Sequence, residues 1–136
     1  MYEIFEHTAD LGLRMRAPDM NRLLEDAARG RCSVIVANPE AIRPVQKVVL
    51  RVDASQPDDV LHDWLGELLY TFDRHRLLLS QFEVEVDANG LAATAHGEPL
   101  DRNRHELLME VKAITYHGLK VERDGTGWLA EVIVDI

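Results

Sequence analysis

Apolar and polar residues alternate over much of the chain, and the period of the alternation separates strands from helices. A period of two indicates strands in seven segments, of which the segment 11–17 has the clearest alternation. Asn89-Gly90 and Asp124-Gly125 stand between such segments and are strong hairpin signals. The predicted strands cover residues 2–5, 11–17, 45–52, 82–86, 91–97, 110–121 and 128–135.

Two segments have apolar residues at helical spacing. The first covers residues 20–35, starts at Pro18-Asp19 and ends at Asn38-Pro39, and Arg31 is the one charged residue on its apolar stripe. The second runs from Pro57 to Phe72 and has a wide apolar stripe. Ser55 and Asp58 have the spacing of a capping box at its start, with Pro57 in the first turn.

These elements predict an α+β fold. We expect a mostly antiparallel sheet of about seven strands, with the two main helices packed on one face. A chain of 136 residues is long enough for one hydrophobic core and too short for two independent ones. The prediction is therefore a single domain over residues 1–136.

Charge and composition limit the kinds of molecule that the protein can bind. With 15 Lys and Arg against 24 Asp and Glu, the net charge is −9, and no basic run is present to hold a polyphosphate backbone. Any link to RNA should therefore pass through a protein partner. No apolar stretch is long enough to span a membrane, and the N-terminal segment does not resemble a signal peptide. Together with the lone Cys32, this predicts a cytoplasmic protein with no membrane contact.

The end of the chain brings carboxylates together. Residues 132–136 contain a continuous apolar run that indicates a buried strand, and Asp135 stands beside the α-carboxylate of Ile136. Two adjacent negative charges in a partly dry place favour a proton or a cation between them. The loop His7-Thr8-Ala9-Asp10 offers a further oxygen donor, and such an all-oxygen set suits Ca²⁺, Mg²⁺ or Mn²⁺. The alternative is a hydrated, frayed terminus.

Other polar groups carry weaker signals. Lys112 lies two residues from Glu110 on one face of a predicted strand, which is usually a solvated pair. The six histidines lack the spacing of a helical zinc site, so most are expected to be surface or hydrogen-bonded core residues. One face of the second helix is acidic and is either solvated or available to a basic partner; it carries Asp59, Asp63, Glu67 and Asp73.

Five short motifs, in order along the whole chain, resemble those of the archease family. They are His7-Thr8-Ala9-Asp10-Leu11-Gly12, Trp64-Leu65-Gly66-Glu67-Leu68-Leu69, Gly97-Glu98 with Asp101 and His105, Glu110-Val111-Lys112-Ala113-Ile114-Thr115-Tyr116-His117, and Asp135-Ile136. Gly66 departs from the asparagine that is usual in the family, and Leu11 replaces the more usual valine.

The resemblance implies a function beyond the residues themselves. Archeases resemble non-enzymatic activators of the RtcB-type RNA ligase of tRNA splicing, which promote guanylylation of the ligase and its multiple turnover. The resemblance implies a divalent metal site at Asp10, Asp135 and Ile136, and a part in ligase activation for His7 and Lys112. RNA would be contacted only indirectly, through the ligase, and no residue of this chain would be catalytic.

Two other functions fit the same residues. One is a metal-dependent phosphoesterase that uses Asp10 and Asp135 with His7 or Lys112 as acid or base, although no phosphate-binding loop is present. The other is a chaperone-like binding module with an incidental metal. Turnover of a phosphoester without any ligase would indicate the phosphoesterase. An effect that is retained when Asp10 and Asp135 are changed to alanine would indicate the chaperone-like module.

Overall fold

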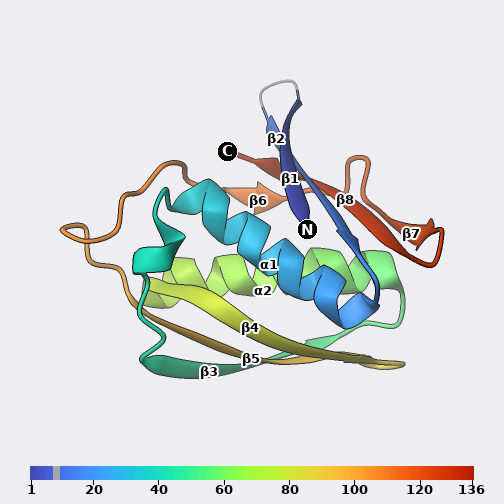
Figure 1. Ribbon diagram of the computed structural model, residues 1–136, viewed down its shortest axis with the longest axis horizontal. Helices are drawn as coiled ribbons and strands as arrows, with labels where there is room; N and C mark the ends of the chain where they lie inside the picture. The colour runs from blue at the N-terminus through green and yellow to red at the C-terminus, as the bar shows by residue number, and fades with distance from the viewer. Residues whose placement is uncertain (8–9) are drawn as a thin grey trace.

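Two antiparallel sheets enclose two helices in the computed structural model, which describes residues 1–7 and 10–136 (Figure 1). The larger sheet is ordered β1-β2-β8-β6, and β7 also pairs with β8. The smaller sheet is ordered β3-β5-β4. The strands are β1 (Tyr2–His7), β2 (Asp10–Ala17), β3 (Gln46–Asp53), β4 (Leu77–Asp87), β5 (Gly90–Pro99), β6 (Ala113–Ile114), β7 (Lys120–Asp124) and β8 (Gly127–Asp135).

The helices are α1 (Met20–Ile35) and α2 (Pro57–His75), with a short 3-10 turn over Pro39–Ala41. The observed starts of the two helices agree with the sequence prediction only in part. Asp19 caps α1, where its side chain accepts a hydrogen bond from the Arg22 amide at 2.8 Å, and Pro57 begins α2. The predicted capping box of α2 is wrong. Its N-cap is Gln56 without a side-chain bond, because Asp58 instead accepts from the Val121 amide of β7 at 3.1 Å.

The core lies around the helix pair and between the sheets. Each helix packs against strands of both sheets, and the Trp64 indole joins the helices by donating to the Leu24 carbonyl at 2.9 Å. The α+β class and the antiparallel pairing are confirmed. The strands divide into two sheets, however, and do not form one sheet with the helices on a single face. The buried surface of α1 explains the difference, because it is too wide for one sheet to cover.

Residues 110–121 do not form the long strand that their alternation predicts. Ala113–Ile114 is strand, and the next strand, β7, begins only at Lys120. The paired segment at Ala113–Ile114 is short because β7 occupies the same edge of β8 from Gly127 to Glu131. The chain then leaves the sheet at Thr115, whose amide and hydroxyl both donate to the Ile133 carbonyl, at 3.1 and 2.9 Å.

Among the described residues, no helix has the length and apolar character needed to cross a membrane.

Candidate metal centre

Asp10 and Asp135 stand directly opposite each other at the ends of β2 and β8. The antiparallel register pairs the two residues, so their α-carbons are about 4.5–5.5 Å apart and their side chains share one face of the sheet. Both residues are half-buried. The structure thus brings together two carboxylates that are far apart in the sequence.

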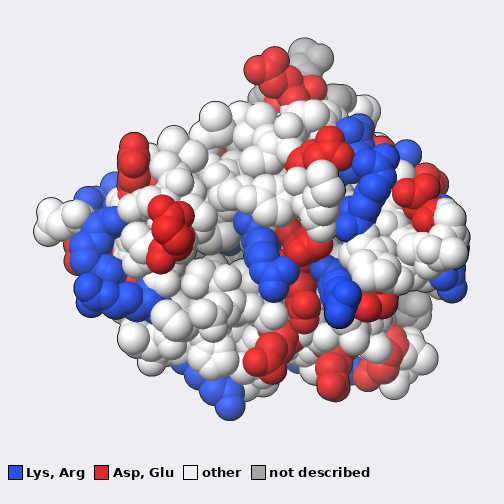
Figure 2. All heavy atoms as spheres, in the orientation of Figure 1, with Lys and Arg blue, Asp and Glu red and all other residues white. Residues whose placement is uncertain are grey.

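The face on which they lie follows from the buried positions of the same strands. Leu13 and Met15 of β2, and Val132 and Val134 of β8, are buried in the same hydrophobic core as the apolar residues of both helices. Side chains alternate along a strand, so Asp10 and Asp135 lie on the opposite, outer face. Figure 2 shows acidic atoms gathered at the tip of the β1–β2 hairpin, at the top of the view.

The end of β8 is held firmly. Val132, Ile133 and Val134 are all buried, as the apolar run predicts for a strand covered on both faces. Ile136 is half-buried and packs against the hydrophobic core. The segment that carries Asp135 and the Ile136 carboxylate is therefore anchored, and the frayed terminus considered above does not describe it.

Lys112 reaches the same place through its backbone. Its amide donates to the Asp135 carbonyl at 2.8 Å, and Ala113 pairs with Asp135 across β6 and β8. The Lys112 side chain is exposed and forms no ion pair with a described residue, so it is not paired with Glu110. The backbone of Lys112 is thereby placed beside Asp135, and its side chain is exposed.

His7, the last residue of β1, pairs with Asp10, the first residue of β2, and the His7 side chain lies outside the described part. The next two residues of that predicted loop, Thr8 and Ala9, are also outside the described residues.

The donor chemistry of this end fits a hard divalent cation. In the described part of the chain no three His, Cys, Asp or Glu side chains are grouped to hold a metal. The further donor expected from the sequence, the α-carboxylate of Ile136, directly follows Asp135 in the chain. Carboxylate oxygens of this sort suit Ca²⁺, Mg²⁺ or Mn²⁺.

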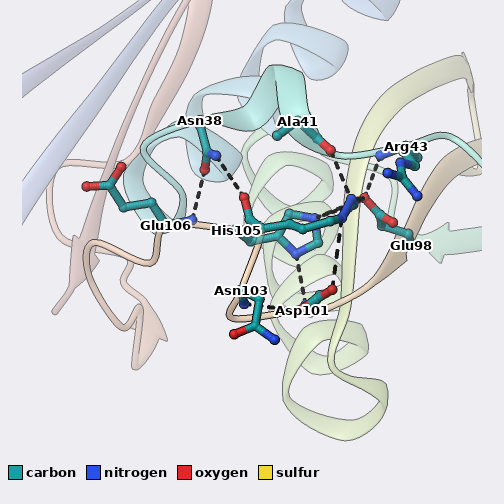
Figure 3. A network of polar contacts seen from close by, with 9 residues as sticks. Asn38, Ala41, Arg43, Glu98, Asp101, Asn103, His105 and Glu106 are labelled. Carbon is teal, nitrogen blue, oxygen red and sulfur yellow. Dashed lines mark hydrogen bonds and ion pairs between the residues drawn. The ribbon is translucent and has the colours of Figure 1, made fainter.

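A second polar network surrounds Glu98 at the end of β5 (Figure 3). Its carboxylate accepts from the Arg43 amide at 2.7 Å, from the Arg104 guanidinium and from His105 Nε2 at 2.9 Å. The Asp101 amide donates a hydrogen bond to His105 Nδ1 at 2.9 Å. The ring proton therefore lies on Nε2, which donates a hydrogen bond to the Glu98 carboxylate. Burial raises the pKa of Glu98, but these hydrogen bonds outweigh burial and lower it to about 2.

This network positions a loop and leaves no group free to react. His105 is almost fully buried, and both its ring nitrogens are engaged. Gly97 allows β5 to approach β4 closely just before Glu98, because a Cβ at position 97 would lie 1.7 Å from the Leu78 carbonyl oxygen. Asn38 holds the far side of the loop through the Arg104 carbonyl and the Glu106 amide, both at 2.9 Å. The loop leads on to Lys112.

Sequence reasoning missed Arg43 and Arg104 as partners of Glu98. Arg43 contributes only a backbone amide, which no side-chain pattern can reveal. Arg104 stands beside His105 in the sequence, and that adjacency was the one signal available. The expectation that histidines serve as hydrogen-bonded structural residues is confirmed for His105, and also for His62, which contacts the Ile114 carbonyl at 3.1 Å and stacks on Tyr116.

Comparison with known proteins supports the relationship that the motifs indicate. The archease protein family model matches residues 2–136. The archease of Methanopyrus kandleri is 36% identical over 139 residues, covering 99% of each chain. The archease of Pyrococcus furiosus is 35% identical over 140 residues, covering 99% of this chain and 98% of its own.

Solved structures share the fold. Protein 1598 of Methanobacterium thermoautotrophicum, solved in solution, has a TM-score of 0.87 and 30% identity, and the match covers 99% of this chain and 98% of that one. The crystal structure of a Thermotoga maritima archease, described as a possible chaperone, has a TM-score of 0.69 and 22% identity. That match covers 100% of this chain and 98% of the other. The family match over nearly the whole sequence, with relatives above 30% identity, shows that this chain belongs to the archease family.

Proposed function

We propose that this chain is a non-enzymatic activator of an RtcB-type RNA ligase, and that it acts with a divalent cation held by Asp10, Asp135 and the Ile136 carboxylate. The observation that carries the proposal is the register of β2 and β8, which sets Asp10 opposite Asp135 beside an anchored chain end. Membership of the archease family supports the choice of partner. The proposed site of action is the cytoplasm.

The residues of this chain would prepare the site in three ways. The strand pairing holds two like charges close together, which favours uptake of a cation between them. The buried end of β8 fixes the position of the Ile136 carboxylate. Lys112, whose backbone bonds to Asp135, has an exposed side chain that would contact an anionic group of the partner. A bound divalent ion would supply positive charge that neutralises a nucleoside triphosphate during guanylylation.

The net charge favours a protein partner over RNA. With a net charge of −9, the chain repels the phosphate backbone of RNA. A basic RNA-binding enzyme, by contrast, attracts an acidic protein of this kind. RNA would then be reached only through the ligase.

The test is a ligation assay with the cognate ligase at catalytic concentration and RNA in excess. The unmodified protein should increase turnover, and Asp10→Asn or Asp135→Asn should reduce that stimulation at least tenfold. Lys112→Ala should weaken stimulation without changing the affinity for Ca²⁺. Glu83→Gln is the matched control, because Glu83 is an exposed carboxylate on the distant β4.

Metal binding is measured separately by thermal unfolding. Donors from distant parts of the chain cannot assemble in the unfolded state, so Ca²⁺, Mg²⁺ or Mn²⁺ should raise the melting temperature. The Asn variants, and a protein extended by residues after Ile136, should lose that rise. Full activation by Asp10→Asn would instead favour a chaperone-like module, and metal-dependent phosphoester turnover without ligase would favour an enzyme.

A further inference from the structure

The outer edge of β3 carries backbone groups with no partner among the described residues. In the described part of the chain, β3 pairs with β5 alone, on its other side. The Ala54 amide donates to the Asn89 carbonyl at 3.2 Å and continues that ladder, so by alternation the amides of Lys47, Val49 and Arg51 face away from β5. These residues therefore offer a row of donors and acceptors to an additional strand.

The opposite edge of the same sheet is protected. The Glu25 carboxylate and the Asn21 side chain of α1 accept from the outward amides of Val84 and Val86 on β4, each at 2.9 Å. Such covering is how proteins prevent unwanted strand pairing. The contrast makes the exposed edge of β3 a distinct feature of the sheet.

A groove runs between the β3 edge and α2. It consists of two cavities of about 390 and 340 Å³, and Glu67 of α2 lines both. Gly66 leaves this wall open, because a Cβ there would meet no atom within 4 Å. The first cavity is lined by Gln46, Val48, Leu50, Glu67, Tyr70, Thr71, His75, Leu77 and Pro99, and the second by Arg51, Val52, Asp53, His62, Asp63, Gly66 and Glu67.

The charge in this groove selects its occupant. Glu67 is half-buried and forms no ion pair with any described residue, and Asp63 lies one helical turn before it. Beyond Glu67 the lining turns apolar at Val48, Leu50 and Tyr70. Alternate residues of an added strand are about 7 Å apart on one face. A lysine or arginine can therefore meet Glu67 while an apolar residue two positions away meets the apolar part.

A second copy of this chain fits the edge poorly. Two β3 strands paired antiparallel about Val49 would set Lys47 of each copy opposite Arg51 of the other. Like charges directly opposite in a ladder are destabilising. The edge is thus arranged against self-pairing and remains open to a different sequence.

We infer that the β3–α2 groove is a docking site for an extended basic segment of a partner protein, which adds to β3 as a fourth strand of the smaller sheet. Backbone hydrogen bonds to Lys47, Val49 and Arg51 provide the attachment, and the pockets for alternate side chains provide specificity. The inference is independent of the metal site and of the ligase.

The first experiment measures the affinity of two labelled heptapeptides by fluorescence anisotropy. The peptide Thr-Lys-Thr-Val-Thr-Lys-Thr presents lysine and valine on one face, and Thr-Glu-Thr-Val-Thr-Glu-Thr is its acidic counterpart. The basic peptide should bind at least tenfold more tightly. Equal affinity of the two peptides would overturn the inference.

Paired variants locate the binding. Val49→Pro removes one outward amide, while Val49→Thr keeps it, and an exposed edge position tolerates both. Only the proline variant should lose the basic peptide. Glu67→Lys should weaken binding at least tenfold, whereas Glu85→Lys, the same charge change on β4, should not. Melting temperatures verify that each variant is folded. If Val49→Pro unfolds, the comparison of Glu67→Lys with Glu85→Lys still tests the inference.

Amide hydrogen exchange supplies the final criterion. Bound peptide should slow exchange at Lys47, Val49 and Arg51 selectively. Slowing that depends on protein concentration without peptide would assign the edge to a second copy. Either that result or protection elsewhere on the molecule would overturn the inference.

Discussion

At the scale of single residues, the buried arginine of α1 is the most unusual feature. Arg31 has 8% of its surface exposed, and its Nε and one terminal nitrogen have no hydrogen-bond partner in the described part of the chain. Burial lowers its pKa to about 10, although Cys32 and Asp73 act in the opposite direction. A buried donor without a partner costs about 1–3 kcal/mol.

We therefore expect Arg31→Met to stabilise the protein. The methionine fills much of the same volume and carries no donor, so the free energy of unfolding should rise by about 1 kcal/mol or more. Urea unfolding of the two proteins measures the difference. A loss of stability would show that the guanidinium is bonded in solution, for example through ordered water.

Glu98 gives a second prediction at this scale, through pH. Its pKa is lowered from 4.5 to about 2 in the folded protein, so its stabilising contribution is complete above pH 4.5 and is lost as the pH falls towards 2. Glu98→Gln should melt at a lower temperature at pH 7. The gap between the two proteins should shrink between pH 4.5 and 2, and a gap independent of pH would contradict the assignment.

At the scale of elements, two glycines in regular structure have opposite roles. Gly12 of β2 lies under the Phe5 ring of β1, and a Cβ at that position would be 2.1 Å from the nearest ring atom. The ring in turn lies 4.7 Å from the Arg14 guanidinium. Gly66 lies in the interior of α2 with open space around it.

The same substitution should therefore change stability in opposite directions. Gly12→Ala displaces the Phe5 ring and should destabilise the β1–β2 hairpin by about 1–2 kcal/mol. Gly66→Ala should stabilise α2 by about 0.5–1 kcal/mol, because alanine restricts the unfolded chain and favours helix. Denaturant titration of both variants measures the change in the free energy of unfolding. A change of the same sign in both variants would contradict the prediction.

At the scale of the whole molecule, charge governs which partners can approach. The excess of acidic over basic residues makes the net charge −9, and many of the arginines are paired with carboxylates, as Arg14 is with Glu131 and Arg104 with Glu98. A phosphate backbone is therefore repelled, whereas a basic protein surface is attracted over about 8 Å at physiological ionic strength.

We expect the protein alone not to bind tRNA exon halves at micromolar concentration and physiological salt. A gel-shift titration without ligase measures this directly. Adding the ligase should bring this protein into an RNA-containing complex whose rate of formation falls as salt rises. A shift with RNA alone would show that the chain contacts RNA itself.

Local features of the molecule follow from the sequence by itself. The two helices, the start of the first at Pro18-Asp19 and the two hairpins depend on neighbouring residues. They occur where the sequence predicts them, with the hairpin turns one residue away from Asn89-Gly90 and Asp124-Gly125. The residue types at Asp10, Asp135 and Ile136 likewise define the chemistry of the candidate metal centre. Helical and strand periods are properties of adjacent turns and pleats, so a sequence displays them directly.

Contacts between distant segments were decided only by the tertiary structure. The division into two sheets, the register of Asp10 with Asp135 and the Glu98 network join segments remote along the chain. Residues 110–121 alternate like a strand, yet before β7 begins at Lys120 only Ala113–Ile114 of this segment pairs with β8, because β7 occupies the rest of that edge. Competition for one strand edge, and burial of a wide helix surface, depend on the whole fold and are absent from any local pattern.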